Sequence, residues 1–365
     1  MEHFPKKETP NPVPEKGANS GKGRVWQGGP VDSRDWSDWR WQYAHRIRRP
    51  ADLAAYLGAS PKEGRVWGEV ARIYPLAVTP YYLSLLDRSD PGDPLRRQCV
   101  PDGREIAPSC HNEEDPLGEE ASMPVPGLIH RYPDRCLILA SRSCAVLCRH
   151  CNRKRLWSRP APRLPRSVRF GPMFRYIAQT PSIREVILSG GDPLTLTDGT
   201  LDWLLGSLRA IPHVEVLRIG SRMPVVLPMR ITPDLCEILK RHRPLWFNTQ
   251  FNAPGELTPE AAHACDRILL AGIPLSSQAV LLRGVNDDET ALETLCNGLQ
   301  RMGVRPYYLF QCDPVRGTDF FRVEEERGAA IMGSLWSRMS GLCLPRYVRD
   351  DPQRGGKIPI PFARP

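Results

Sequence analysis

The sequence predicts an α/β protein whose main body is a partial (βα)6 barrel of the TIM type, preceded by an N-terminal helical region. Six apolar segments of β-type composition recur from residue 136 onward, and a helical pattern follows each of them, as in parallel βα units. No Gly-x-Gly-x-x-Gly turn follows the first segment, which argues against a dinucleotide-binding fold. We expect strands at 136–140, 185–188, 214–219, 245–247, 273–282 and 304–310, and helices at 168–179, 199–210, 232–242, 258–271, 288–301 and 323–337.

The composition is typical of a globular enzyme. The chain has 365 residues, of which 41% are hydrophobic and 25% charged, so it can bury a large core. No stretch approaches the ~20 apolar residues of a membrane helix, and the N-terminus has no apolar signal-peptide core. We therefore expect a cytoplasmic protein without a membrane partner. The net charge of +9 is dispersed along the chain, which indicates a solvated surface, and we expect no nucleic-acid partner.

Composition also divides the chain into four segments. Before the barrel, Trp36, Trp39 and Tyr43 are spaced to share one face of a helix, and Thr79 precedes a proline as a helix cap does. Residues 90–130 are polar and rich in turn signals, so they are expected to be loops. The expected segments are a disordered tail at 1–34, the helical region with its connecting loop at 35–125, the barrel at 126–345 and a C-terminal segment at 346–365.

Three closely spaced cysteines, Cys144, Cys148 and Cys151, follow the first predicted strand. In a reducing compartment such cysteines bind metal more often than they form disulfides. Three soft thiolates suit an iron–sulfur cluster in which one iron stays open to another ligand. A structural zinc site, or simply buried cysteines, would show the same spacing, so the spacing alone leaves these alternatives open.

The ends of the other predicted strands are polar as well. They carry Ser189–Pro193, Gly220–Arg222, Asn248–Asn252, Ser277 with Gln278, and Gln311–Asp313. Because the C-terminal ends of parallel barrel strands hold the chemistry, these residues are expected to meet at one mouth. Gly190 and Gly191 would let a ligand approach the backbone, and Asp192 would accept from a ligand ammonium group. S-adenosylmethionine has the amino and carboxylate groups that would satisfy both this turn and an open iron.

A glycine-rich loop near the C-terminus holds Lys357. It is no P-loop, because Ile358 stands where that motif has Ser or Thr. Lys357 is either an ordinary surface residue or a lysine that forms a Schiff base with an aldehyde cofactor. For a phosphate-bearing cofactor, Arg131 and Arg135 just before the first strand would supply cations, and Tyr132 would stack on its ring.

These motifs together resemble the lysine 2,3-aminomutases, radical S-adenosylmethionine enzymes that use pyridoxal phosphate. The resemblance covers residues 35–362 and implies the partial barrel of the radical S-adenosylmethionine class. The matching stretches are 36–42, 130–135, 144–151, 189–192, 218–222, 282–287, 305–308 and 355–357.

The resemblance also implies roles for individual residues. Cys144, Cys148 and Cys151 would hold a [4Fe–4S] cluster whose fourth iron binds S-adenosylmethionine. Lys357 would be the Schiff-base lysine of pyridoxal 5′-phosphate, and Arg153 would pair with the α-carboxylate of the substrate. Further cofactor contacts are expected from Gly190, Gly191, Asp192, Ser221, Arg222 and Gln278. The side-chain ammonium of the substrate would lie on Asp313 and Asp350, because two carboxylates in a closed mouth require a cation.

The implied activity moves the α-amino group of L-lysine to its β-carbon. Arginine or ornithine would satisfy the same charges, and β-lysine for translation-factor modification is an alternative, as is a cluster- or zinc-bearing nucleic-acid-binding protein. An electron donor such as flavodoxin or ferredoxin is expected, and a homo-oligomer is left open. The sequence departs from the family where Gln250 replaces a typical His and Asp288 a zinc-binding Cys. It ends at Pro365 before the zinc-binding cysteines of some relatives, so no interchain zinc is expected.

Overall fold

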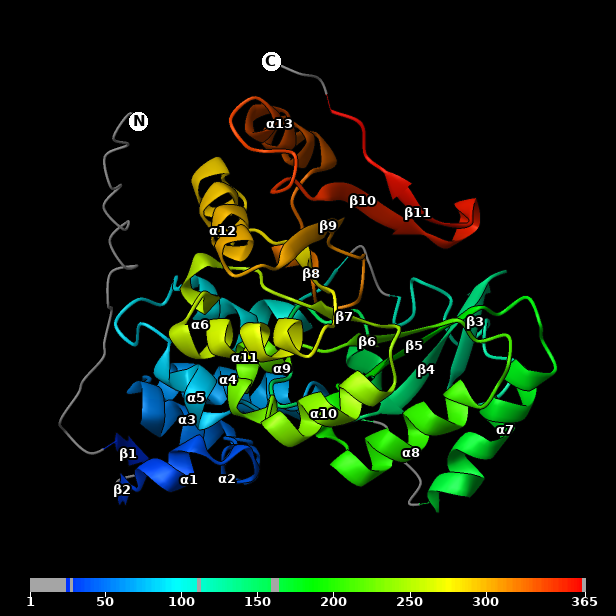
Figure 1. Cartoon of the computed structure of the whole chain (residues 1–365). Coiled ribbons are helices and arrows are strands. Elements are labelled where there is room, and N and C mark those ends of the chain that lie inside the picture. Colours follow the sequence, from blue (N-terminus) through cyan, green and yellow to red (C-terminus); the bar gives the residue numbers. More distant parts are fainter. Residues whose placement is uncertain (1–23, 27–28, 110–112, 159–163, 363–365) are drawn as a thin grey trace, which may run out of the picture.

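A curved sheet of nine strands forms the centre of the molecule, and helices cover its outer side (Figure 1). This computed structural model describes residues 24–26, 29–109, 113–158 and 164–362. The strands of the central sheet are β3 (Leu128–Tyr132), β4 (Arg135–Ser141), β5 (Glu185–Gly190), β6 (Val216–Gly220), β7 (Leu245–Thr249), β8 (Leu275–Leu281), β9 (Arg305–Gln311), β10 (Arg346–Asp351) and β11 (Gly356–Pro359).

The sheet order explains how one mouth forms. The strands lie in the order β11-β10-β9-β8-β7-β6-β5-β4-β3. All neighbours from β4 to β10 are parallel, and the two outer strands, β3 and β11, pair antiparallel with β4 and β10. The C-terminal ends of β4 to β9 therefore lie along one rim, as predicted. All six predicted strands are present, and β10 adds a seventh parallel strand.

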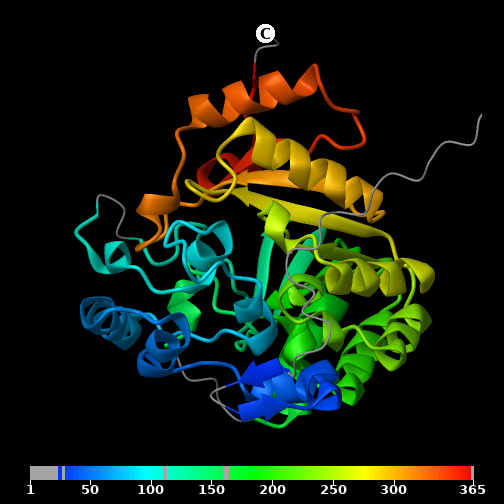
Figure 2. The same cartoon turned by 90° about the vertical axis from the view of Figure 1, so that its left-hand side faces the viewer.

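Six helices of the barrel lie where they were predicted, and the short α9 was not predicted. They are α7 (Arg166–Ala178), α8 (Asp198–Arg209), α9 (Met223–Val226), α10 (Pro233–Arg241), α11 (Pro259–Leu270), α12 (Glu289–Arg301) and α13 (Glu325–Trp336). Thr197, Thr232 and Thr258 cap α8, α10 and α11 by accepting backbone N–H groups, which explains where these helices begin. Figure 2 shows α12 and α13 side by side above the C-terminal strands.

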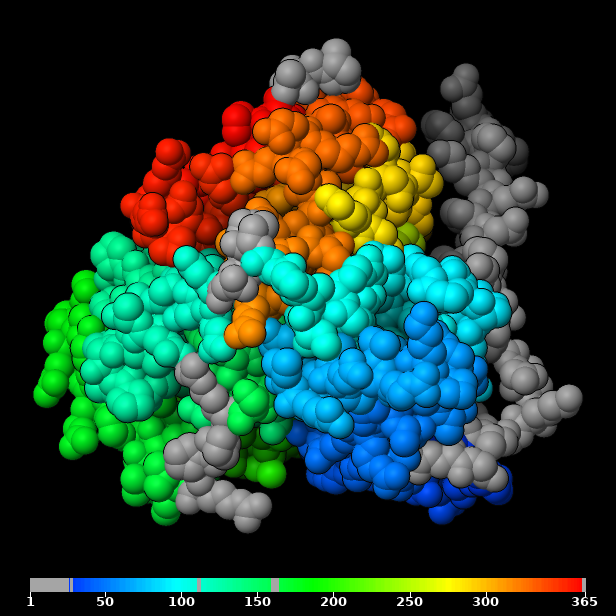
Figure 3. Space-filling view, turned by 180° about the vertical axis from the view of Figure 1, so that it is seen from behind, coloured from blue at the N-terminus to red at the C-terminus, as the bar shows by residue number. Residues whose placement is uncertain are grey.

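The N-terminal region forms a helical layer against the barrel. Its helices are α1 (Ser33–Ser37), α2 (Trp39–Ala44), α3 (Pro50–Leu57), α4 (Pro61–Ile73), α5 (Pro80–Ser84) and α6 (Pro94–Cys99). Thr79 caps α5 as predicted, and Ser60 with Glu63 forms a capping box at the start of α4. Seen from behind, this region (blue to cyan) occupies one flank of the molecule and touches both the green and the orange parts of the chain (Figure 3).

Three expectations about the part of the chain before the barrel need correction. Trp36, Trp39 and Tyr43 do not share one helix, because Asp38 ends α1 and caps α2. The expected loop at 90–130 contains α6 and the start of β3. Residues 24–26 and 29–31 of the expected tail form the strands β1 (Arg24–Trp26) and β2 (Gly29–Val31), while 1–23 and 27–28 lie outside the described residues. The expected C-terminal segment at 346–365 contains β10 and β11, which extend the sheet.

Candidate active site

One cavity of about 360 Å³ lies at the rim formed by the strand ends, and every predicted site residue lines it. Its size falls within the ~300–1,000 Å³ that is common for small-molecule sites. The cysteine loop after β4 lies in one part of its lining, and β3, β10 and β11 contribute another. The tertiary structure thus brings together residues from 131 to 357 that the sequence only suggested belong together.

The three predicted cluster cysteines differ from the other cysteines in exposure. Cys144, Cys148 and Cys151 are half-buried and line the cavity, whereas the other seven cysteines in the described part of the chain are buried. Burial raises the pKa of the Cys151 thiol to about 11 and that of Cys144 well above its ordinary value. Without a metal these thiols hold their protons, and metal binding would release them.

The N-terminal region holds the backbone of the cysteine loop. Leu147 N donates to the carbonyl of Ala77 at 2.9 Å, and Arg149 N donates to the carbonyl of Gln98 at 2.8 Å. The guanidinium of Arg46 donates to the carbonyl oxygen of Cys144. The N-terminal helical layer therefore positions the cysteine loop.

A buried charge cluster anchors the same loop from its other side. Glu105 accepts from Arg149 Nη2 at 2.6 Å and from Lys154 Nζ at 2.7 Å, and all three side chains are at most 1% exposed. Burial lowers the pKa of Lys154 to about 8, and Glu105 opposes this effect. Two buried cations on one carboxylate leave no spare acceptor, so the loss of Glu105 would leave both unpaired.

Gly190 and Gly191 serve the protein's own backbone. A Cβ atom on Gly190, which has a φ of +123°, would lie 2.4 Å from Ser141 O, and one on Gly191 would lie 2.5 Å from Ser143 O. Gly191 N and Asp192 N donate to these same carbonyls at 2.6 and 2.8 Å. The turn therefore packs directly on the start of the cysteine loop, and a close approach by a ligand stays a prediction.

Asp192 is likewise engaged within the protein. Its Oδ1 accepts from Ser221 Oγ at 2.8 Å and from Leu194 N at 3.0 Å, and its Oδ2 accepts from Arg222 N at 2.9 Å. Burial raises the pKa of Asp192 to about 6, although these hydrogen bonds oppose that shift. Asp192 thus ties the end of β5 to the end of β6, and its predicted contact with a ligand ammonium group stays a prediction.

Lys357 stands at the other end of the cavity, where the two edges of the sheet meet. Its Nζ lies 3.5 Å from Tyr132 Oη, which joins β11 to β3. The Arg135 guanidinium stacks on the Tyr132 ring at 3.8 Å. A Cβ on Gly356 would lie 2.3 Å from Tyr132 Oη, so glycine is required for this close approach. The predicted lysine, ring and cation are therefore neighbours.

The two predicted ammonium-binding carboxylates have different partners. Asp350 pairs with Arg131 Nη2 at 2.8 Å, with both side chains nearly buried. Asp313 accepts from the amide of Asn152 at 3.1 Å and forms no ion pair within the described residues. Burial, and then the negative charge of Asp350, raise the pKa of Asp313 to about 7. Asp313 is therefore the carboxylate that still needs a cation.

Arg153 has a partner that the sequence did not reveal. Its Nε and Nη2 donate to the Glu119 carboxylate at 2.9 and 2.6 Å, while its Nη1 lies 3.2 Å from Ser189 Oγ. Burial opposes ionisation of Glu119, but Arg153 and Arg155 lower its pKa to about 2. One edge of the Arg153 guanidinium is thus committed to Glu119, and the Nη1 side faces the end of β5.

Gln250 contacts a histidine from the cysteine loop. Its amide nitrogen lies 3.3 Å from His150 Nε2, and the amide nitrogen of Asn252 lies at the same distance. Burial lowers the pKa of His150 well below its ordinary value, so the ring is neutral. Asp288, the second departure from the family pattern, caps α12 by accepting from Ala291 N at 2.8 Å. His150 lies inside the cysteine motif but was not predicted as a site residue, and Glu119 carried no sequence signal that could have marked it.

The residues present fit the groups that the resemblance implies. Among the described residues, no three His, Cys, Asp or Glu side chains are gathered closely enough for a single metal ion. Cys144, Cys148 and Cys151 all line the same cavity, and three soft thiolates suit an iron–sulfur cluster. At the other end, the cations and the ring beside Lys357 suit a phosphorylated aromatic aldehyde.

Comparison with known proteins agrees with this description. Residues 138–295 match the model of the radical SAM superfamily. Together, this match, the partial barrel and the three-cysteine loop define the chain as a radical S-adenosylmethionine enzyme. No helix in the described ranges is long and apolar enough to cross a membrane.

Its relatives identify the family within that class. The chain is 45% identical over 330 residues to the L-lysine 2,3-aminomutase of Clostridium subterminale, covering 90% of this chain and 79% of that protein. It is 44% identical over 330 residues to the enzyme of the same name from Acetoanaerobium sticklandii, covering 90% and 80%. The glutamate 2,3-aminomutase of Clostridioides difficile is 38% identical over 326 residues, covering 89% and 77%. The chain belongs to the lysine 2,3-aminomutase family.

Proposed function

We propose that this protein moves the α-amino group of L-lysine to the β-carbon and so produces β-lysine. Membership of the family implies a [4Fe–4S] cluster, S-adenosylmethionine and pyridoxal phosphate as cofactors. When bound, the cluster and S-adenosylmethionine supply a 5′-deoxyadenosyl radical for hydrogen abstraction, and pyridoxal phosphate supplies a conjugated aldehyde that carries the migrating amine. The remaining chemistry of binding and orientation falls to the side chains of the chain itself.

The observation that carries the choice of substrate is the carboxylate of Asp313, which has no ion-pair partner among the described residues. Relatives of this chain include enzymes named for lysine and one named for glutamate, so membership alone does not select the substrate. Asp313 and Asp350 lie close enough for the charge of one to raise the pKa of the other. A cationic side chain would neutralise Asp313, whereas a glutamate side chain would add a third carboxylate. This charge arrangement favours lysine.

Each remaining site residue has a role that its position supports. Cys144, Cys148 and Cys151 would hold the cluster, and Lys357 would hold the aldehyde carbon and release it to the substrate amine. Arg153 would bind the substrate carboxylate through the Nη1 edge that Glu119 leaves open. We also propose that the barrel begins near residue 126 and that the segment 346–365, which carries Lys357, adds β10 and β11 to its sheet.

The ion pair between Arg131 and Asp350 links the two binding functions. Arg131 is assigned to the cofactor phosphate and Asp350 to the substrate ammonium, yet in the protein alone they neutralise each other at 2.8 Å. Each partner would exchange this contact for one with a ligand of opposite charge. The exchange avoids leaving either group unpaired in a nearly buried place.

Two further features complete the proposal. The reaction needs one electron to start, and we propose a small one-electron carrier such as flavodoxin or ferredoxin as the donor. The ten described cysteines are all free thiols, which suits a reducing compartment, and we place the protein in the cytoplasm. A homo-oligomer is compatible with these assignments.

Anaerobic reconstitution tests the proposal. The wild-type protein should bind four irons and four sulfides, and borohydride reduction should attach a pyridoxyl group to Lys357, seen by mass spectrometry. With dithionite and S-adenosylmethionine, L-lysine should turn over to β-lysine. Lys357→Ala should lose the adduct and keep the iron. Turnover of L-glutamate or L-arginine in place of L-lysine would refute the substrate assignment.

A further inference from the structure

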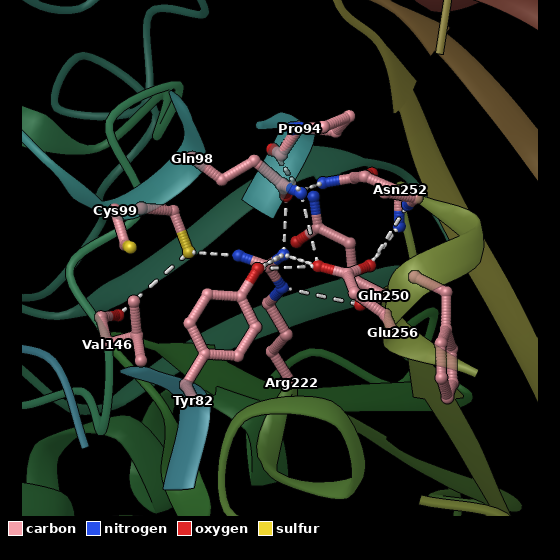
Figure 4. Close-up of polar contacts among 12 residues, drawn as sticks. Tyr82, Pro94, Gln98, Cys99, Val146, Arg222, Gln250, Asn252 and Glu256 are labelled. Carbon is pink, nitrogen blue, oxygen red and sulfur yellow. Dashed lines mark hydrogen bonds and ion pairs between the residues drawn. The ribbon is translucent and has the colours of Figure 1, made fainter. Parts of the chain in front are cut away.

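A buried polar cluster is built around the Arg222 guanidinium (Figure 4). This guanidinium contacts the side chain of Cys148. Arg222 Nη1 donates to Cys148 Sγ at 2.7 Å. On its opposite side, Nη2 donates to Glu256 Oε1 and to Gln98 Oε1, both at 2.6 Å. Arg222 is 7% exposed, and Glu256 and Gln98 are fully buried. The guanidinium thus bridges a cluster cysteine and a buried carboxylate.

Glu256 accepts hydrogen bonds at both of its carboxylate oxygens. Its Oε1 accepts from Tyr82 Oη at 2.7 Å, and its Oε2 accepts from the backbone nitrogens of Asn252 at 2.6 Å and Ala253 at 3.1 Å. Glu256 belongs to the short helix η5 (Pro254–Glu256) after β7. A carboxylate with this many fixed donors cannot follow the guanidinium if it moves, so moving Arg222 would leave a buried charge unpaired.

Two members of this cluster come from the N-terminal region. Tyr82 lies on α5 and Gln98 on α6, both outside the residues 138–295 that match the radical SAM superfamily. Gln98 uses both its side chain, on Arg222, and its backbone carbonyl, on Arg149 N in the cysteine loop. The N-terminal region therefore helps to determine where the guanidinium and the loop stand relative to each other.

We propose that Tyr82, Gln98 and Glu256 are positioning residues that hold Arg222 as a hydrogen-bond donor on Cys148 Sγ. Through this contact, Arg222 raises the reduction potential of the iron–sulfur cluster. The inference rests on the proposed function, because it requires that Cys148 binds the cluster.

The direction of the effect follows from charge. Reduction adds one electron to a cluster whose thiolate ligands already carry negative charge, so a cation that donates to one sulfur stabilises the reduced form more than the oxidised form. The negative charge of Glu256 partly offsets this effect. Loss of Arg222 and loss of the Glu256 charge should therefore shift the potential in opposite directions, which a merely structural role would not produce.

A redox titration of the reconstituted full-length protein tests the proposal. The midpoint potential is measured by the EPR signal of the reduced cluster during titration with dithionite, without S-adenosylmethionine. Arg222→Met should lower it by about 59 mV, equivalent to a tenfold change in the one-electron equilibrium. Glu256→Gln keeps an acceptor for Nη2 but removes the charge, and should raise it.

Arg230 provides a matched control, because it is fully buried and pairs with Asp198 at 2.6 Å, yet it makes no contact with a cluster cysteine. Arg230→Met should leave the potential unchanged. If Arg222→Met does not assemble the cluster, Tyr82→Phe is titrated in its place, and its midpoint potential should be slightly lower than that of the wild-type protein. The proposal is overturned if the potential of Arg222→Met, or of Tyr82→Phe where that variant replaces it, is unchanged or raised, or if Arg222→Met and Glu256→Gln shift it equally. A wild-type protein without a cluster signal would instead refute the proposed function.

Discussion

Replacing Asp313 with Asn should stabilise the ligand-free protein at pH 8 while removing its preference for a cationic substrate. The folded protein raises the pKa of Asp313 from its ordinary value of 3.8 to about 7. Because the folded state retains the proton more strongly, stability is greatest below pH 3.8 and falls as the pH rises toward 7. At ~1.36 kcal/mol for each pKa unit, the ionised carboxylate costs ~4 kcal/mol above pH 7.

The assay is urea denaturation of wild-type and Asp313→Asn proteins, both without cofactors, at several pH values. The stability gained by the variant should increase by ~3 kcal/mol between pH 5 and pH 8, since the wild-type carboxylate ionises over this interval. The amide has no charge to lose, so the variant itself should show little of this dependence. Substrate binding to the loaded enzyme should weaken in parallel.

Asp350→Asn is the matched control, because it lies in the same cavity and differs in having a cation. Asp350 pairs with Arg131 at 2.8 Å, with side chains 11% and 12% exposed. Its removal leaves a nearly buried arginine unpaired and should destabilise the protein by ~3 kcal/mol. If Asp313→Asn gives no stability at pH 8, or a gain independent of pH, the account of Asp313 as a carboxylate awaiting a cation is wrong.

Three further predictions concern the supports of the site. Glu105→Gln should lower the free energy of unfolding in urea by ~3–5 kcal/mol, because Arg149 and Lys154 lose their buried partner. Glu215→Gln, at a side chain 61% exposed, should lower it by less than ~1 kcal/mol. Equal losses would contradict the role of burial. Gly191→Ala should reduce bound iron after reconstitution, because its Cβ would lie 2.5 Å from Ser143 O, while Gly199→Ala, with no atom within 4 Å, should bind iron normally. Glu119→Gln should lower the free energy of unfolding by ~3 kcal/mol at neutral pH, because Arg153 and Arg155 lower the pKa of Glu119 to about 2. In acid denaturation this difference should disappear as the pH falls from 4.5 toward 2. A difference that persists at pH 2 would rule out the ion pairs as its source.

Much of the barrel could be predicted because local patterns decide it. Parallel strands buried on both faces read as apolar runs, and threonine caps before α8, α10 and α11 mark where the helices begin. Short edge strands carry weaker signals. Strand β3 and the pair β10–β11 were missed because they mix polar and apolar residues. They form by pairing with β4, with β9 and with each other.

The partners of the site residues were harder to predict than the residues themselves. Glu119 lies 34 positions before Arg153, and Gln98 lies 124 positions before Arg222, so no local spacing connects them. Gly191 also packs against the backbone of Ser143, a contact within the chain that the local sequence does not show. Burial creates such demands for partners, and burial depends on the whole fold.

By itself the sequence determined which residue types stand in the predicted site: three cysteines, a glycine pair, a lysine in a glycine-rich loop and two carboxylates. These depend on local patterns and could be recognised without knowing the fold. Only the tertiary structure decided that Asp350 is paired with Arg131 while Asp313 is not, and that the N-terminal helices reach Cys148 through Arg222. Charge pairing acts over a few ångströms in space, so it becomes defined only when distant segments are packed together.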